Sequence, residues 1–281
     1  MAVKIIIKSK GLFKKELAFK DIIEPGMRYG VMDEAYRLDE NKVGDYTVIF
    51  EAKRICRGFE ISFSKGQTRL SLPLPSSKHE IEYFYNFVQK ICRKMKTDEF
   101  IREEELVRLE DIQKFISLDV DASLRALEIM TTDVMEDKYD SMYIFGATNP
   151  IAIGKDEVKL FDNNLDKLAD YLHEIQSLDV YYAKPNVYKN GQGDLFAVYV
   201  LTENVPSVIP YKPNLFMANK DMKVDDWNVA LIYDEKMAGT ISYDDFLSSI
   251  TKREKYDAEH FIVSLSKDEM KKLLAEYRKD I

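Results

Sequence analysis

Residues 69–95 constrain the fold of this chain more than any other segment, because a strand pattern changes there to a helix pattern within a few residues. Polar and apolar residues alternate from Arg69 to Leu74, and prolines at positions 73 and 75 end the alternation. Ser77 and Glu80 then have the spacing of a capping box. Apolar residues follow at intervals of three and four, which predicts an amphipathic helix with one buried face: Ile81, Phe84, Tyr85, Val88, Ile91, Cys92 and Met95.

The rest of the chain predicts short strands interrupted by helices. Segments 46–52, 58–64 and 68–74 are rich in β-branched and aromatic residues and form a predicted meander before the helix. Later helices are expected after Asn163 and after Ser266, where capping residues precede amphipathic stripes. Strands and helices do not alternate regularly, so we predict an α+β fold with mixed or antiparallel short-stranded sheets and several capped helices.

The length of 281 residues is compatible with two domains. We predict a β-meander with its capped helix over 1–98, a helical connector over 99–140 and a second α+β domain over 141–281. A single large domain is the alternative. Within the connector, Glu103 to Glu105 are expected to form the first turn of a helix, where carboxylates suit the helix dipole.

The composition excludes several classes of function. Forty-one basic and forty-nine acidic residues give a formal charge of −8, which opposes non-specific attraction to nucleic acid or to anionic lipid. The isoleucine run near the N-terminus is shorter than a signal peptide core or a spanning helix. Cys56 and Cys92 form no metal-binding or redox motif. We therefore expect a cytoplasmic protein without a bound cofactor, with no membrane association and with nucleic acid as an unlikely partner.

The densest acidic cluster is the main candidate for catalytic chemistry. Asp119, Asp121, Asp133 and Asp137 would hold Mg²⁺ or Ca²⁺ if the fold brought their carboxylates together, and a metal-dependent hydrolase is therefore one alternative function. Asp121 is better explained as a helix N-cap, and the other acids as a solvated helix end. No nucleophile elbow or phosphate-binding loop accompanies them.

Two further sets of residues are candidates for binding. Three prolines between positions 205 and 213 stiffen a segment that would present Val208, Ile209 and Tyr211 to a partner at a low entropy cost. Tyr182, Tyr199 and Trp227 would line the pocket of a small-ligand sensor, which is a second alternative function. For the proline-rich segment, a rigid connection with its apolar groups buried is the competing interpretation.

The segment 58–100 resembles a family of uncharacterised bacterial proteins of unknown function. The resemblance lies in Phe59 to Phe63, in the run Leu72 to Ser77 and in Glu80 to Tyr85. It implies a bacterial cytosolic setting and carries no catalytic or binding residues. Since nothing else predicts catalysis, we expect a non-enzymatic protein that binds a macromolecular partner, most simply another protein, as an adaptor, regulator or immunity-type antitoxin.

Overall fold

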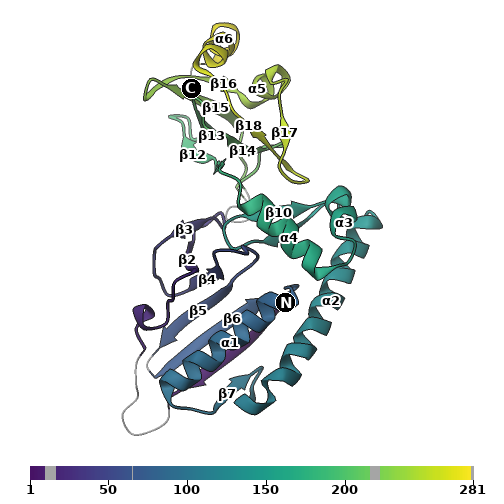
Figure 1. Ribbon diagram of the computed structural model, residues 1–281. Coiled ribbons are helices and arrows are strands. Elements are labelled where there is room, and N and C mark those ends of the chain that lie inside the picture. Colours follow the sequence, from purple (N-terminus) through teal and green to yellow (C-terminus); the bar gives the residue numbers. More distant parts are fainter. Residues whose placement is uncertain (10–16, 65, 216–221, 280–281) are drawn as a thin grey trace. The chain divides into compact units, whose positions relative to one another are not determined.

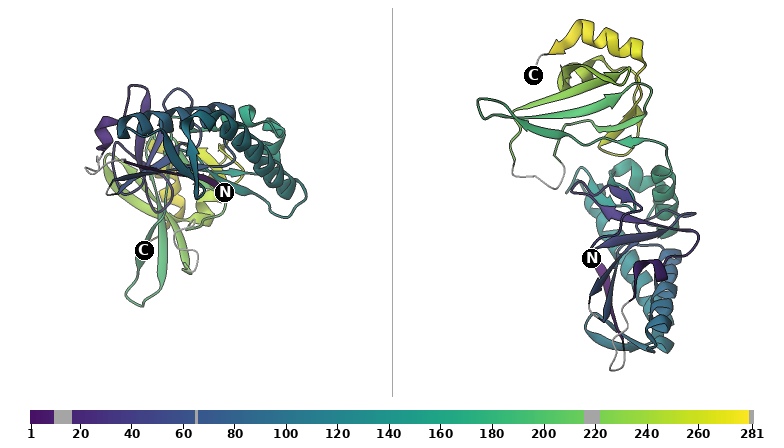
Figure 2. Two further views of the ribbon diagram at one scale, coloured as in Figure 1. Left: turned by 90° about the horizontal axis from the view of Figure 1, so that it is seen from below. Right: turned by 90° about the vertical axis from the view of Figure 1, so that its left-hand side faces the viewer.

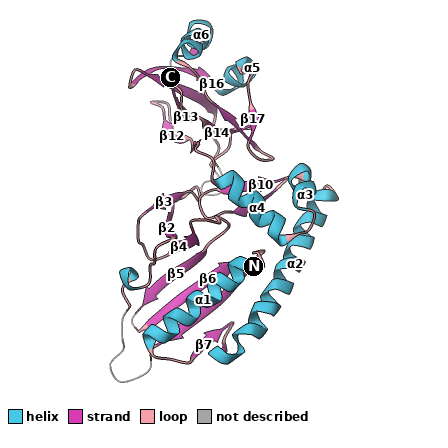
Figure 3. Ribbon diagram, in the orientation of Figure 1, coloured by secondary structure: helices cyan, strands magenta, loops and turns pink. Residues whose placement is uncertain are grey.

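The computed structural model describes residues 1–9, 17–64, 66–215 and 222–279 of the chain (Figure 1). Contacts between residues divide the chain into two compact units, Met1–Ser177 and Leu178–Ile281. Each unit contains both sheets and helices (Figure 3), which confirms the predicted α+β class.

Unit 1 is built on an antiparallel sheet whose eight described strands run in the order β3-β2-β4-β5-β6-β1-β7-β8. Its strands are β1 (Ala2–Lys8), β2 (Met27–Met32), β3 (Leu38–Glu40), β4 (Thr47–Glu51), β5 (Phe59–Ser64), β6 (Gln67–Pro73), β7 (Glu99–Arg102) and β8 (Glu105–Arg108). A separate hairpin joins β9 (Met142–Phe145) to β10 (Pro150–Ile153). The helices are α1 (Lys78–Met95), α2 (Ile112–Met135), α3 (Lys155–Phe161) and α4 (Leu165–Gln176).

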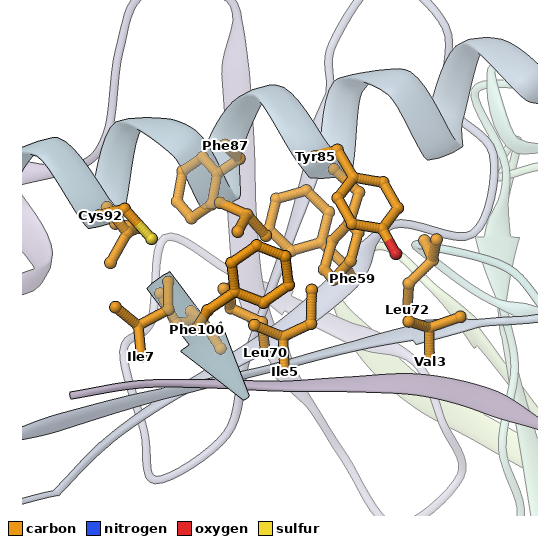
Figure 4. Packing of buried hydrophobic residues seen from close by; sticks show 14 of the residues in the cluster. Val3, Ile5, Ile7, Phe59, Leu70, Leu72, Tyr85, Phe87, Cys92 and Phe100 are labelled. Atoms are coloured by element: carbon orange, nitrogen blue, oxygen red, sulfur yellow. The ribbon is translucent and has the colours of Figure 1, made fainter. Parts of the chain in front are cut away.

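The core of unit 1 lies between one face of this sheet and the helices α1 and α2 (Figure 2). Every apolar residue predicted for the stripe of α1 is buried. Those side chains pack on alternate residues of β1, β5 and β6 (Figure 4), as the period of two along a strand requires. Burial of one such face fixes the strand register, because a slip by one residue would expose every apolar side chain.

The predicted helical connector over 99–140 is not a separate part of the molecule. Its first residues form β7 and β8, and β7 pairs with β1 in the main sheet. Glu103 and Glu104, predicted as a helix start, occupy the turn between these strands with φ angles of 44° and 76°. The rest forms α2, which packs on α1. Because these contacts tie 99–140 to the first sheet, the division between the units follows Ser177 and differs from the predicted domain boundaries.

Unit 2 contains two sheets and two helices among its described residues. A five-stranded sheet has the order β12 (Asn186–Lys189), β13 (Leu195–Thr202), β15 (Asp226–Tyr233), β16 (Lys236–Ser242) and β19 (Arg278–Lys279). A four-stranded sheet has the order β11 (Tyr181–Tyr182), β14 (Ser207–Pro210), β18 (His260–Val263) and β17 (Glu254–Lys255). The helices α5 (Tyr243–Ser249) and α6 (Lys267–Tyr277) complete a core shared by both sheets.

Candidate functional site

The centre of the proline-rich segment is buried. Val208 and Ile209 are fully buried in β14, which lies between β11 and β18. Tyr211 is 37% exposed, and its ring lies 5.0 Å from that of Phe261. The prediction of partner binding by these residues is therefore wrong for Val208 and Ile209, because the stiff segment is an interior strand.

The three aromatic residues predicted to line a pocket belong to two different sheets of unit 2. Tyr199 and Trp227 stack with their centroids 6.2 Å apart on one face of the five-stranded sheet. The Tyr199 hydroxyl donates to the carbonyl of Asn214 at 2.9 Å, and the side chain is 2% exposed. Tyr182 belongs to the four-stranded sheet, where its hydroxyl lies 3.0 Å from Nε2 of His260. Tyr199 is thus part of a filled core.

The four aspartates predicted to bind a metal do not converge. Asp119 and Asp133 lie fourteen positions apart on α2, which places them on the order of 20 Å apart along the helix axis. Asp121 is exposed, Asp133 pairs with Lys138 at 2.7 Å, and Asp137 pairs with Lys155 beyond the helix end. Within the described ranges, no group of three His, Cys, Asp or Glu side chains is arranged to hold a metal ion. The prediction of this metal site is wrong.

Asp119 instead belongs to a buried polar network that joins α2 to α1 and β7. Its carboxylate accepts a hydrogen bond from the Tyr85 hydroxyl at 2.6 Å and pairs with the Arg102 guanidinium. Nε of Arg102 donates to the Tyr85 oxygen at 3.1 Å, and the guanidinium lies 4.9 Å from the centre of the Phe115 ring. Burial and the nearby carboxylate raise the pKa of Tyr85, so the phenol stays protonated. The network is structural.

Glu80 has a second role that the capping-box spacing did not reveal. Ser77 accepts from the backbone N–H of Glu80 at 3.2 Å, as predicted. The Glu80 carboxylate, however, accepts from the backbone N–H groups of Arg57 and Gly58, at 2.9 and 2.8 Å. It thereby fixes the loop before β5 on the N-terminus of α1. Burial raises the pKa of Glu80 despite these hydrogen bonds.

This burial leads to a pH-dependent prediction for the Glu80→Gln variant. A raised pKa means that folded protein binds the Glu80 proton more tightly than unfolded protein, so the stability from this group falls as pH rises from the ordinary glutamate pKa through the raised one. Glutamine keeps an acceptor for both N–H groups without the charge. We expect the stability of Glu80→Gln relative to wild type to increase with pH across that window, measured as urea midpoints at several pH values. A relative stability that decreases with pH would show that the carboxylate is held ionised.

The sheet of unit 1 has a second face, which the sequence did not single out. On the strands β5, β6 and β1, the residues pointing away from α1 form three successive rows across the sheet. The register places them as Ser62–Arg69–Ile6 and Glu60–Ser71–Lys4 across all three strands, and as Pro73–Ala2 across β6 and β1. Lys4, Glu60 and Arg69 are exposed. We call this surface, over the three rows, the open face.

Two hollows lie on the open face. The first, here the Arg69 hollow, has a volume of about 300 Å³ and covers the first two rows, with the 64% exposed Tyr46 beside them. Neither Arg69 nor Lys4 has an ion-pair partner in the part of the chain that the structure describes. Partial desolvation raises the pKa of Glu60, whose carboxylate lies in the middle row. The Arg69 hollow therefore combines two available cations, serine hydroxyls, an aromatic ring and one acid.

The second hollow, here the Arg57 hollow, adjoins the first and has a volume of about 240 Å³. It covers the second and third rows, so that Glu60 and Ser71 line both hollows. The other lining residues are mainly apolar: Ala2, Met32, Tyr36, Val48, Phe59, Pro73 and Phe145 accompany Arg57, Gly58 and Gly146. Arg57 supplies the basic group of this hollow.

Arg57 is half-buried, and two backbone carbonyls hold its guanidinium. Its Nε donates to the carbonyl of Phe145 at 3.1 Å, and its Nη1 donates to that of Pro75 at 3.2 Å. Burial lowers the pKa of Arg57 to about 10. Among the described residues no carboxylate forms an ion pair with it, although Glu80 acts on its charge from a greater distance.

Comparison with known proteins identifies the family of the chain. Residues 2–273 match the family described as a domain of unknown function (DUF4299), and the chain belongs to that family. The resemblance to an uncharacterised family predicted from residues 58–100 is therefore confirmed, and it extends over nearly the whole chain. Neither the curated proteins nor the solved structures contain a match.

None of the helices in the described ranges has the length and apolar character needed to cross a membrane.

Proposed function

We propose that this chain is a non-enzymatic protein that binds a macromolecular partner, another protein, on the open face of its eight-stranded sheet. The observation that carries the proposal is the pair of adjoining hollows, which share Glu60 and Ser71 and follow the strands β5 and β6 over three rows. A small metabolite needs one enclosed pocket, whereas a polypeptide uses a series of open contacts along a sheet. The bacterial cytoplasmic setting implied by the family resemblance is part of this proposal.

The charges of the open face support a specific partner. The chain has a formal charge of −8, yet Lys4, Arg57 and Arg69 gather around Glu60 on this surface. A local charge opposite in sign to that of the whole molecule favours one orientation of docking and disfavours non-specific association. Regulators and adaptors need this kind of selective contact.

A pull-down with charge-reversed variants tests the function. Tagged wild-type protein is compared with the double variant Lys4→Glu/Arg69→Glu in native lysate, at several salt concentrations. Both side chains are exposed, so the fold is expected to persist. We expect the partner to be recovered by wild type and lost, at least about tenfold, by the double variant, since two favourable charge contacts become repulsive.

Arg125→Glu is the matched control, because Arg125 is an exposed cation on α2 of the same unit. It should recover the partner as wild type does. Hydrogen exchange in the presence of the recovered partner should then show protection in β5 and β6. Equal recovery by the double variant, or recovery of no partner at any salt concentration, would contradict the proposed function.

A further inference from the structure

The Arg57 guanidinium indicates what kind of partner segment the open face binds. A buried cation is normally paired with an anion, because desolvating an isolated charge is costly. Arg57 has two carbonyl acceptors, while a guanidinium carries five N–H groups. It lies next to the Arg57 hollow, since its Nε donates to Phe145, which also lines that hollow. A carboxylate entering the hollow would give the guanidinium an anion in direct contact, in addition to the more distant Glu80.

The shape of the Arg57 hollow suits an acidic side chain on an apolar stem. Val48 and Phe59 are buried beneath it, and Tyr36 and Phe145 pack ring to ring at 4.5 Å along it. Such walls exclude water from a charge pair and strengthen it. Arginine binds carboxylates with two parallel hydrogen bonds, which fixes direction as well as charge.

The spacing of the rows under the two hollows favours an extended segment. Positions on one face of a strand repeat every two residues, on the order of 6.6 Å, and the three rows of the open face have the same repeat. An extended peptide lying along β5 and β6 therefore places every second side chain over one row. Residues at positions i and i+4 would meet the third row, where Arg57 lines the hollow from the loop before β5, and the first row, which contains Arg69.

The middle row selects the type of residue at position i+2, which lies between the two acids. Glu60 lies at the β5 end of this row and would repel an acid at position i+2 of a segment lying over β5 and β6, whereas Lys4 lies at the β1 end. A serine or threonine at i+2 would instead donate its hydroxyl to the Glu60 carboxylate. Nucleic acid fits less well, because Glu60 interrupts the cations and, among the described residues, Tyr46 alone gives the Arg69 hollow an aromatic ring.

We propose that the open face binds an extended acidic segment of a partner protein, with one carboxylate paired to Arg57, a hydroxyl residue over Glu60 and a second carboxylate, four positions away, paired to Arg69 and Lys4. This inference rests on the proposed function and specifies the chemistry of the same site. It predicts a motif of acid, any residue, Ser or Thr, any residue, acid.

Fluorescence anisotropy with short labelled peptides tests this motif. The probe is Thr-Glu-Thr-Ser-Thr-Glu-Thr, and the control peptide has the same composition with its two glutamates adjacent. We expect the spaced probe to bind wild type about tenfold more tightly, because the adjacent pair cannot reach both arginines. Binding should weaken with salt. Equal affinities, or no binding of the spaced probe, would overturn the inference.

Variants locate the contacts. Arg57→Gln should weaken binding of the spaced probe by about tenfold or more, and Arg69→Glu by a similar factor, whereas Arg125→Glu should bind as wild type does. Arg57 also holds two loops, so Arg57→Gln could affect the fold as well as binding. Ser71→Trp is therefore a second variant: its large side chain would occupy space in both hollows, which Ser71 lines, without removing a hydrogen bond of Arg57. It should bind at least about tenfold more weakly. Undiminished binding by Ser71→Trp would contradict the site.

The outcomes separate the two proposals. If open-face variants lose the native partner but wild type does not bind the spaced probe, the acidic motif is wrong and the proposed function stands. If a short labelled oligothymidylate binds more tightly than the probe, the partner class is nucleic acid and the inference fails. If open-face variants retain the native partner, both proposals fail.

Discussion

Asp119→Ala is expected to lower the free energy of unfolding of unit 1 by about 3–5 kcal/mol, the usual cost of removing one partner from a buried charge pair. Asp119 is 1% exposed and receives the Tyr85 hydroxyl and the Arg102 guanidinium. Alanine would leave that cation beside an apolar ring and a phenol hydroxyl that has lost its acceptor. The network connects α1, α2 and β7, so its loss weakens the attachment of the long helix to the sheet.

Urea unfolding measures this effect, with far-ultraviolet circular dichroism reporting on both units. The single tryptophan of the chain, Trp227, lies in unit 2. If the two units unfold independently, the urea midpoint followed by its fluorescence should therefore be the same in wild type and in Asp119→Ala. Asp121→Ala is the matched control, because Asp121 is exposed on the same helix, and its effect should stay within about 0.5 kcal/mol. Equal effects of the two substitutions would show that the buried network contributes little.

This prediction replaces the metal-binding role that the sequence analysis considered for Asp119 as an alternative. The acidic cluster was defined by nearness along the chain, but a helix distributes its side chains around its axis and along its length. Asp119 points to the core while Asp121 points to solvent. Its partners, Tyr85 and Arg102, come from elements that were predicted separately, so no local pattern could join the three.

Elements with strong periodicity were predicted well. The stripe of α1 and the strands β4, β5 and β6 followed directly from spacings of three and four residues and of two. The hairpin of β7 and β8 was missed because Glu103 and Glu104 adopt positive φ angles, where glycine or asparagine is the usual signal. Three consecutive glutamates are more typical of a helix start.

The open face could not be predicted from the sequence. Alternation along β1, β5 and β6 identifies which residues share a face, but it does not reveal whether a second layer covers the polar side. The rows arise from pairings between distant residues, such as Lys4 with Ser71. No sequence pattern indicated Arg57, because its role depends on burial and on the carbonyl groups of Phe145 and Pro75.

Tyr199→Ala is expected to destabilise unit 2 by about 3–5 kcal/mol, the range for removing a large aromatic side chain from a core. The Tyr199 ring packs on Trp227 and, at a centroid distance of 5.3 Å, on Tyr243. The prediction separates a core role from the pocket role considered for these rings. A pocket residue would tolerate truncation with little loss of stability, because a solvent-filled space would lie beside it.

Tyr199→Phe is the control that divides this effect into its parts. Phenylalanine keeps the ring packing and removes the hydrogen bond to the Asn214 carbonyl, at an expected cost of about 0.5–1.5 kcal/mol. Both variants can be followed by Trp227 fluorescence during urea unfolding, since that ring stacks on residue 199. Loss of stability should be several times larger for alanine than for phenylalanine. A small effect of alanine would mean that the site is not a filled core, and the interpretation of Tyr199 and Trp227 as a ligand pocket would then be favoured again.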